Sequence, residues 1–204
     1  IANPNNPTGT FVPAAEVAEF LASVPSNVVV VLDEAYTEYL EPADRFDSTE
    51  WVRQYPNLIV VRTFSKAYGL AGLRMGMGLA QPELTDLMNR VRQPFNVNSL
   101  AQAAAIAALG DEEFLRRSYE INRAGLQRMQ AAFAEMGVEY LPSYGNFVLV
   151  RVGDAAAVYE SLLRDAVIVR PVGGYGLPEW LRVSVGLPEE NETFLAAFKR
   201  ALGR

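Results

Sequence analysis

The sequence predicts an α/β protein: a mostly parallel sheet with helices on both faces, followed by a small α+β unit. Two observations carry this prediction. Continuous aliphatic runs at residues 28–33 and 58–62 are typical of strands buried on both faces of a parallel sheet. After residue 138 the predicted segments become shorter, and residues 181–185 alternate between apolar and polar like a half-buried strand. A long helix after the sheet layer suggests a connection between domains, so the boundary is predicted between residues 112 and 113.

Local signals predict the elements in order. The predicted helices cover 14–22, 51–55, 82–92, 99–109, 111–136, 155–164 and 189–202, and the predicted strands cover 28–33, 58–62, 75–80, 138–141, 146–151, 167–170 and 181–185. Pro13 suits a first helical turn, Ser99 is the expected N-cap of an alanine-rich helix, and Gly137 is expected to end the longest one. Residues 37–50 and 171–176 are predicted to be loops.

Composition excludes several classes of site. The 204 residues carry a net charge of −6 and scattered arginines, which argues against a nucleic-acid groove. There is no His and no Cys, so His-based triads, thiolate sites and disulfides are excluded, and we expect no metal. Without a run of about 18 apolar residues or a visible signal peptide, we expect a cytoplasmic protein with no membrane partner. Because the chain opens with Ile1 inside a turn-rich segment, we also expect that an N-terminal portion is missing.

Lys66 is the first candidate catalytic residue. The chain has only two lysines, and Lys199 lies among ordinary charges on the predicted C-terminal helix. Lys66 follows a predicted buried strand, at the edge where open α/β sheets bind ligands. A partly desolvated amine there can act as a covalent nucleophile. The ordinary alternative is a solvated loop lysine.

Further polar residues follow the same two strands. Asp33 and Tyr36 follow the first strand, Ser65 and Arg74 accompany Lys66 after the second, and Asn6 lies in the opening loop. Pyridoxal phosphate chemistry needs this set: an amine for the aldehyde, a carboxylate for the ring nitrogen, donors for the phenolate, and hydroxyls with an arginine for the phosphate. Taken singly, each residue is more simply a cap, a turn residue or a surface charge, but their joint order is improbable by chance.

These motifs resemble those of fold-type I aminotransferases. The resemblance rests on Asn6-Pro7-Thr8-Gly9, Asp33-Glu34-Ala35-Tyr36, Ser65-Lys66 with Arg74, and Arg182. Within that superfamily the chain is similar to the histidinol-phosphate aminotransferases, through the blocks at 4–9, 63–74 and 181–186. The resemblance covers all 204 residues, but about three-fifths of such an enzyme. It implies that residues 1–112 are part of the pyridoxal-phosphate-binding large domain and residues 113–204 are the small α+β domain.

The resemblance also implies roles. Lys66 would hold the cofactor as a Schiff base and later move the substrate Cα proton, and Asp33 would pair with the pyridinium nitrogen. Asn6 and Tyr36 would hydrogen-bond the phenolate oxygen. Three residues would bind or support the cofactor phosphate, namely Ser65, Arg74 and Thr63.

The implied substrates are histidinol phosphate and glutamate with 2-oxoglutarate. Arg182 would bind the substrate anion, with Arg170 as a second phosphate ligand and Asn6 nearby, because two planar guanidinium forks suit a phosphomonoester. The resemblance further implies a homodimer, and a backbone-rich phosphate loop, a ring-stacking aromatic and a partner-subunit tyrosine that cannot be assigned in this chain. As a truncated chain it is therefore expected to have weak activity or none.

Several alternatives stay open at this stage. Within the superfamily these are an aromatic or other amino-acid aminotransferase and a decarboxylase of a phosphorylated amino acid. From another class, residues 28–34 resemble the strand-Asp-Glu pattern of a P-loop ATPase, but no Gly-x-x-x-x-Gly-Lys-Ser/Thr loop is present. A binding fragment with a vestigial site is the third alternative.

Overall fold

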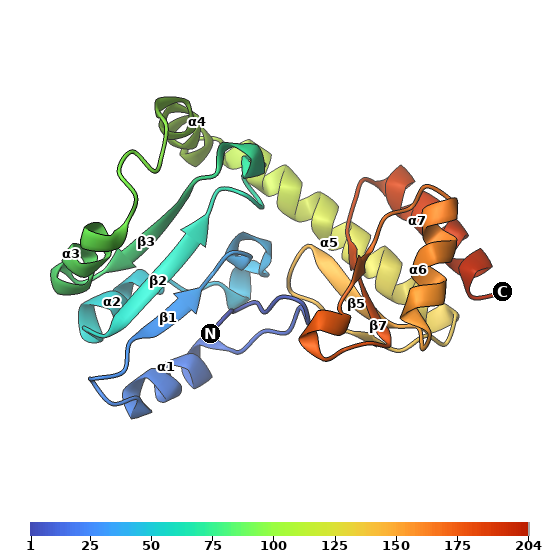
Figure 1. Ribbon diagram of the computed structural model, residues 1–204, viewed down its shortest axis with the longest axis horizontal. Helices are drawn as coiled ribbons and strands as arrows, with labels where there is room; N and C mark the ends of the chain where they lie inside the picture. Colours follow the sequence, from blue (N-terminus) through green and yellow to red (C-terminus); the bar gives the residue numbers. More distant parts are fainter. Residues whose placement is uncertain (204) are drawn as a thin grey trace. The chain divides into compact units, whose positions relative to one another are not determined.

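The computed structural model describes residues 1–203, which divide into two compact units. The first unit comprises Ile1–Pro4 and Phe11–Arg117, and the second comprises Asn5–Thr10 and the chain from Ser118 onward. The division by contacts falls inside the longest helix, a few residues after the predicted boundary at 112/113. Figure 1 shows the elements of each unit.

The first unit contains a three-stranded mixed sheet in the order β1-β2-β3. β1 (Val30–Asp33) is parallel to β2 (Leu58–Thr63), and β3 (Gly76–Ala80) is antiparallel to β2. The α/β class is confirmed, but only one of the two strand pairs is parallel. The reason lies in the β2–β3 connection, which contains only the short 3-10 helix η3 (Ala71–Leu73), whereas a parallel pair needs a longer crossover.

The helices of the first unit follow the predicted segments closely. They are α1 (Ala14–Ser23), α2 (Thr49–Gln54), α3 (Pro82–Val91), α4 (Ser99–Leu109) and the beginning of α5 (Glu112–Glu135), with short 3-10 helices η1 (Thr37–Tyr39) and η2 (Pro42–Asp44) in the predicted loop. The predicted cap Ser99 is wrong by one residue. Asn98 is the N-cap, because its side chain accepts a hydrogen bond from the backbone N–H of Ala101.

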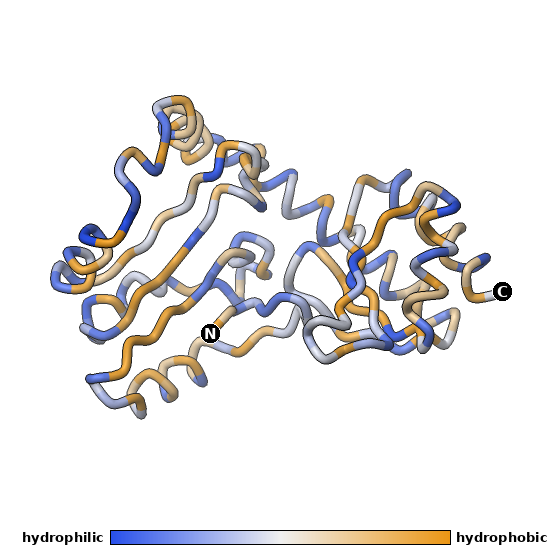
Figure 2. Tube along the Cα trace, viewed as in Figure 1, coloured by the Kyte–Doolittle hydropathy of each residue, from blue (hydrophilic) through white to orange (hydrophobic). Residues whose placement is uncertain are grey.

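The core of the first unit lies on one face of the sheet. Side chains of α1 and α2 pack there against alternate residues of the strands, including Leu32 and Val60. In Figure 2 the hydrophobic colour follows β1 and β2. The prediction that β1 is buried on both faces is wrong within the described residues. Val29 and Val31 are 51% and 43% exposed, because in residues 1–203 no element covers that face of β1 fully.

The second unit contains a four-stranded antiparallel sheet in the order β4-β5-β7-β6. Its elements are β4 (Tyr140–Leu141), β5 (Phe147–Arg151), α6 (Ala155–Arg164), β6 (Arg170–Pro171), η4 (Gly173–Tyr175), β7 (Trp180–Ser184) and α7 (Pro188–Ala201). β6 overlaps the strand predicted at 167–170 only at Arg170. The backbone N–H of Val167 bonds to the Leu162 carbonyl, which closes the turn that follows α6.

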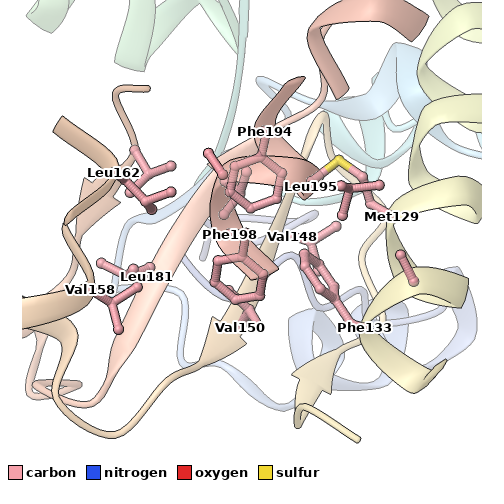
Figure 3. Packing of buried hydrophobic residues seen from close by; sticks show 14 of the residues in the cluster. Met129, Phe133, Val148, Val150, Val158, Leu162, Leu181, Phe194, Leu195 and Phe198 are labelled. Atoms are coloured by element: carbon pink, nitrogen blue, oxygen red, sulfur yellow. The ribbon is translucent and has the colours of Figure 1, made fainter. Parts of the chain in front are cut away.

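A hydrophobic core joins this sheet to α5, α6 and α7. Figure 3 shows Phe133 of α5 and Phe198 of α7 within it, and their rings meet edge-on with centroids 5.5 Å apart. Both side chains are fully buried. Burying one such side chain stabilises the fold by about 1.5–3 kcal/mol.

Among residues 1–203, no helix combines the length and the hydropathy needed to cross a bilayer.

Candidate active site

Most of the predicted cofactor residues lie at one edge of the first sheet. Asp33 is the last residue of β1 and Thr63 is the last residue of β2. Because these strands are parallel, in a register that pairs Asp33 with Val61, their carboxyl ends meet at the same edge. Asn3 extends this edge, since its backbone N–H bonds to the Asp33 carbonyl at 2.9 Å.

Lys66 lies in the loop that follows β2. Its Nζ is 5.6 Å from the centroid of the Tyr36 ring, a cation–π distance, and Tyr36 itself is buried. Two backbone hydrogen bonds hold the loop, from Gly69 to the Lys66 carbonyl and from Leu70 to the Phe64 carbonyl, both at 2.9 Å. The expected partial burial of the amine is not found, because Lys66 is exposed in the described chain.

Asp33 is exposed at the strand end. Its Oδ1 accepts a hydrogen bond from the backbone N–H of Ala35 at 3.0 Å, which fixes the carboxylate in a turn. Asp33 can stabilise the turn and also bind a cofactor. Oδ1 accepts the hydrogen bond from Ala35, and the carboxylate has further lone pairs for a second donor.

Thr63, Ser65 and Arg74 are the residues predicted to bind or support the cofactor phosphate. Thr63 Oγ1 accepts from the Ser65 backbone N–H at 3.1 Å and donates to the Met75 carbonyl at 3.4 Å. Arg74 has φ 56° and ψ 48°, a left-handed backbone that costs a non-glycine residue about 1–2 kcal/mol. Backbone strain of this kind clusters at functional sites, which supports a ligand role for Arg74.

The predicted substrate residues lie in the second unit. Arg182 Nη1 donates to Asn6 Oδ1 at 2.5 Å, and the Arg182 guanidinium carbon is 4.9 Å from the centroid of the Phe147 ring. Arg182 Nε is buried and has no hydrogen-bond partner among the described residues. A buried cationic donor without a partner costs free energy, which marks Arg182 as a candidate functional residue.

Arg170 pairs with Arg182 across β6 and β7. Both arginines line one pocket of about 590 Å³. Its other lining residues are Tyr159, Ile168, Val169, Pro171, Gly174, Tyr175 and Ser184. Two guanidinium groups and two tyrosines in one pocket form a donor set that suits a phosphate ester.

The structure therefore gathers the predicted residues into two sets. The first unit holds Asp33, Tyr36, Thr63, Ser65, Lys66 and Arg74, and the second holds Asn6, Arg170 and Arg182. Asn6 and Tyr36 belong to different units. Their hydrogen bonds to the same cofactor oxygen therefore stay a prediction.

Two features were missed by the sequence analysis. Phe147 lies under the Arg182 guanidinium, and Arg62 forms an ion pair with Glu34. Strand alternation could have placed Phe147 and Arg182 on one face, once the pairing of β5 and β7 was known. No local signal could have indicated the Arg62–Glu34 ion pair, whose partners lie 28 residues apart.

The chain belongs to the class I and II aminotransferase family, whose model matches residues 1–198. It is 67% identical over 208 aligned residues to histidinol-phosphate aminotransferase 2 of Ralstonia nicotianae, covering 100% of this chain and 56% of that protein. This assignment argues against the P-loop ATPase alternative. The chain thus spans a little over half the length of that relative.

Solved structures show the same fold. Histidinol-phosphate aminotransferase from Sinorhizobium meliloti, in complex with pyridoxal-5'-phosphate, matches 100% of this chain and 56% of its own, with a TM-score of 0.92 and 36% identity. L-threonine-O-3-phosphate decarboxylase from Porphyromonas gingivalis matches 100% of this chain and 64% of its own, with a TM-score of 0.87 and 27% identity. The fold is therefore that of the fold-type I enzymes.

Proposed function

We propose that this chain supplies the cofactor lysine and the substrate arginines of a pyridoxal-phosphate-dependent aminotransferase. The reaction would transfer the amino group of histidinol phosphate to 2-oxoglutarate, giving 3-(imidazol-4-yl)-2-oxopropyl phosphate and glutamate. The observation that carries the proposal is the placement of Lys66 beside Tyr36, at the sheet edge that also bears Asp33.

The residues present fit the cofactor. Lys66 offers an exposed amine, and Asp33 offers an exposed carboxylate fixed by a turn. Ser65 and Arg74 lie at the two ends of the same connection between β2 and β3, and offer a hydroxyl and a guanidinium for a phosphate dianion. When bound, pyridoxal phosphate supplies an aldehyde that takes up the substrate amine and a ring that accepts electrons from the substrate Cα.

Each residue then has a defined task. Lys66 Nζ would accept the proton released from the substrate Cα and would later donate it back. Asp33 would stabilise a protonated ring nitrogen by its negative charge. Arg182 and Arg170, which line the same pocket, would bind the substrate phosphate.

The same residues also suit two other classes of substrate that enzymes of this fold could use. The likeness to a phosphothreonine decarboxylase favours a phospho-amino-acid decarboxylase as the second candidate. Product analysis distinguishes the two: an aminotransferase converts 2-oxoglutarate to glutamate, whereas a decarboxylase releases carbon dioxide. Aromatic amino acids as alternative donors are tested in the same assay.

The first experiment asks which lysine binds the cofactor. The purified chain is mixed with pyridoxal phosphate, reduced with borohydride and mapped by peptide mass spectrometry. A parallel sample uses a hybrid enzyme, in which this chain replaces the segment it matches in the R. nicotianae relative. We expect the adduct on Lys66, with Lys199 on α7 as the internal control lysine.

Replacing Lys66 by Ala should abolish the adduct and the visible absorbance of the bound cofactor. An adduct on neither lysine in the chain and the hybrid, or absorbance that persists in the variant, would overturn the proposal. An adduct in the hybrid alone would show that the site needs residues beyond these 204.

We also propose that the enzyme is a cytoplasmic homodimer, in keeping with the family resemblance. Residues 1–112 would form part of the cofactor-binding domain and residues 113–204 the small domain. Sedimentation velocity of the hybrid enzyme tests the dimer, and a monomer at micromolar concentration would contradict it.

A further inference from the structure

We propose that Glu34 and Arg62 form a positioning pair that fixes the two strand ends bearing Asp33 and Lys66, an inference that rests on the proposed function. Arg62 Nε donates to Glu34 Oε2 at 2.8 Å. The Glu34 side chain is only 2% exposed and that of Arg62 is 27% exposed. The pair touches neither cofactor nor substrate in the proposed site, so both residues would act through their neighbours.

The Glu34–Arg62 pair lies on the face of the sheet opposite to the side chains of Asp33 and Thr63, two of the proposed cofactor-binding residues. Side chains alternate along a strand, so Glu34 projects to the face opposite Asp33, and Arg62 to the face opposite Thr63. The backbone N–H of Glu34 bonds to the Val61 carbonyl at 2.9 Å, which continues the parallel ladder past the end of β1. The side-chain pair therefore links β1 and β2 directly behind the residues proposed to hold the cofactor.

Arg62 has a second anchor. Its Nη2 donates to Ser48 Oγ at 3.2 Å, and Ser48 is fully buried. The Ser48 carbonyl in turn accepts from the Trp51 backbone N–H at the start of α2. One guanidinium thus joins the end of β1, the end of β2 and the beginning of α2, which a planar fork of donors can do and a lysine cannot.

Burial separates this pair from the surface ion pairs. In Arg128–Glu192, for comparison, the side chains are 47% and 54% exposed. Exposed pairs are screened by water and contribute little, whereas a buried carboxylate needs its partner in a fixed geometry. A further carboxylate, Glu38, faces Arg62, and burial raises its pKa. The charge of Arg62 lowers the pKa of Glu38, as does that of Arg45, so both cations oppose the effect of burial.

The position of the pair has a consequence for the site. Catalytic groups must be held within a fraction of an ångström, and the supporting residues behind them set that position. A slip between β1 and β2 would move Asp33 relative to the Lys66 loop without unfolding the unit. Loss of the pair should therefore weaken cofactor binding more than it weakens the fold.

The test uses the hybrid enzyme and a double variant, Glu34→Leu with Arg62→Met. Apolar replacement of both partners leaves no buried unpaired charge and often preserves stability. The control is Arg128→Met with Glu192→Leu, which removes an exposed pair of the second unit. The readouts are the dissociation constant for pyridoxal phosphate, the pH midpoint of its absorbance when bound, and the melting temperature without cofactor.

We expect the double variant to bind pyridoxal phosphate about tenfold more weakly or worse, with a shifted pH midpoint and a melting temperature close to that of the parent. The control should match the parent in affinity and in midpoint. Parental affinity and midpoint in a folded double variant would overturn the positioning role.

Two single variants cover the case in which the double variant does not fold. Arg62→Lys keeps the charge but not the fork, and Ser48→Ala removes one anchor without changing any charge. Each should weaken cofactor binding and shift the midpoint, and parental values in both would overturn the inference. A parent hybrid that binds no pyridoxal phosphate would instead overturn the proposed function, and this inference with it.

Discussion

Arg182 and Asn6 are joined by a hydrogen bond of 2.5 Å although 176 residues separate them. The loop that carries Asn6 is tied to the same unit by the hydrogen bond from Tyr144 N–H to the Gly9 carbonyl at 2.8 Å. The Arg182 guanidinium is thus fixed by Asn6 at one nitrogen and by the Phe147 ring below it, while Nε is left without a partner. These two contacts restrict the rotamers of Arg182, so a ligand that binds it would pay less conformational entropy.

The first prediction concerns Phe147. In the hybrid enzyme, Phe147→Leu should raise KM for histidinol phosphate about two- to fivefold with little change in kcat, because the cation–π contact orients Arg182 equally in the substrate complex and in the transition state. Steady-state kinetics measure this. Phe133→Leu is the matched control, since it removes a similar volume from the core of the same unit. An equal rise in KM in both variants would indicate a general packing effect.

The second prediction concerns Asp33. Asp33→Ala should lower kcat of the hybrid by orders of magnitude while the borohydride-trapped adduct still forms on Lys66, because the carboxylate stabilises the charged ring and does not form the covalent bond. Rates and peptide mapping are measured on the same preparation. Asp44→Ala, in the 3-10 helix η2 of the same unit, is the control. Unchanged turnover in Asp33→Ala would assign the electron-accepting role elsewhere.

The third prediction concerns the packing of α5. In an open helix, Gly→Ala stabilises by about 1 kcal/mol. At Gly125 an added Cβ would lie 2.3 Å from Val185 Cγ1 and 2.9 Å from Asn191 Nδ2. Gly125→Ala should therefore lower the free energy of unfolding by about 1–3 kcal/mol, as overpacked cores do.

Gly110→Ala provides the matched control for this experiment. Its nearest neighbour would be the Ala107 carbonyl oxygen at 3.6 Å, an ordinary contact, so we expect a neutral or slightly stabilising effect. Urea unfolding of the two variants measures both. A Gly125→Ala variant as stable as Gly110→Ala would show that Val185 and Asn191 move aside at little cost.

The fourth prediction concerns pH. Burial, the largest cause, raises the pKa of Glu38 above its usual value of 4.5, and the nearby Glu34 carboxylate adds to it. Between 4.5 and the raised value the folded chain binds more protons than the unfolded chain, so stability falls as pH rises through this window. Glu38→Gln removes this loss, so the stability of the variant should rise relative to that of the parent as pH increases from 4.5 through the raised pKa.

Asp47→Asn should show the opposite sign. Hydrogen bonds from Thr49 lower the pKa of Asp47 below its usual 3.8, so its stabilising effect is present above that value and is lost as pH falls through the lowered pKa. The asparagine variant should therefore lose stability relative to the parent as pH rises from the lowered pKa to 3.8, and the difference should stay constant at higher pH. Melting curves across the pH range measure both variants, and slopes of the same sign would contradict the assignment.

Local sequence signals determined much of the secondary structure. The helix predicted at 155–164 is found at those bounds as α6, and the strand at 58–62 is found as β2 with one further residue. These predictions succeed because helical periodicity, capping residues and β-branched runs act over a few neighbouring residues. The class of fold was predicted from the same kind of local pattern, and the chemistry of the lysine loop stays a prediction.

Contacts between distant residues were decided by the tertiary structure alone. The sequence could not show that β3 runs antiparallel to β2, that Val31 is left 43% exposed, or that Asn98 replaces Ser99 as the cap. Strand direction and burial depend on which segments pack together, and a polar run offers several equivalent caps.

The same limit applies to the candidate site. The sequence indicated Lys66 and Asp33 as candidate catalytic residues from their types and order, and Arg182 as a candidate substrate ligand through the family resemblance. Only the tertiary structure paired Arg182 with Asn6 and Arg62 with Glu34, since those contacts join segments 176 and 28 residues apart. Hydrogen bonds over such separations depend on backbone geometry that no local pattern encodes.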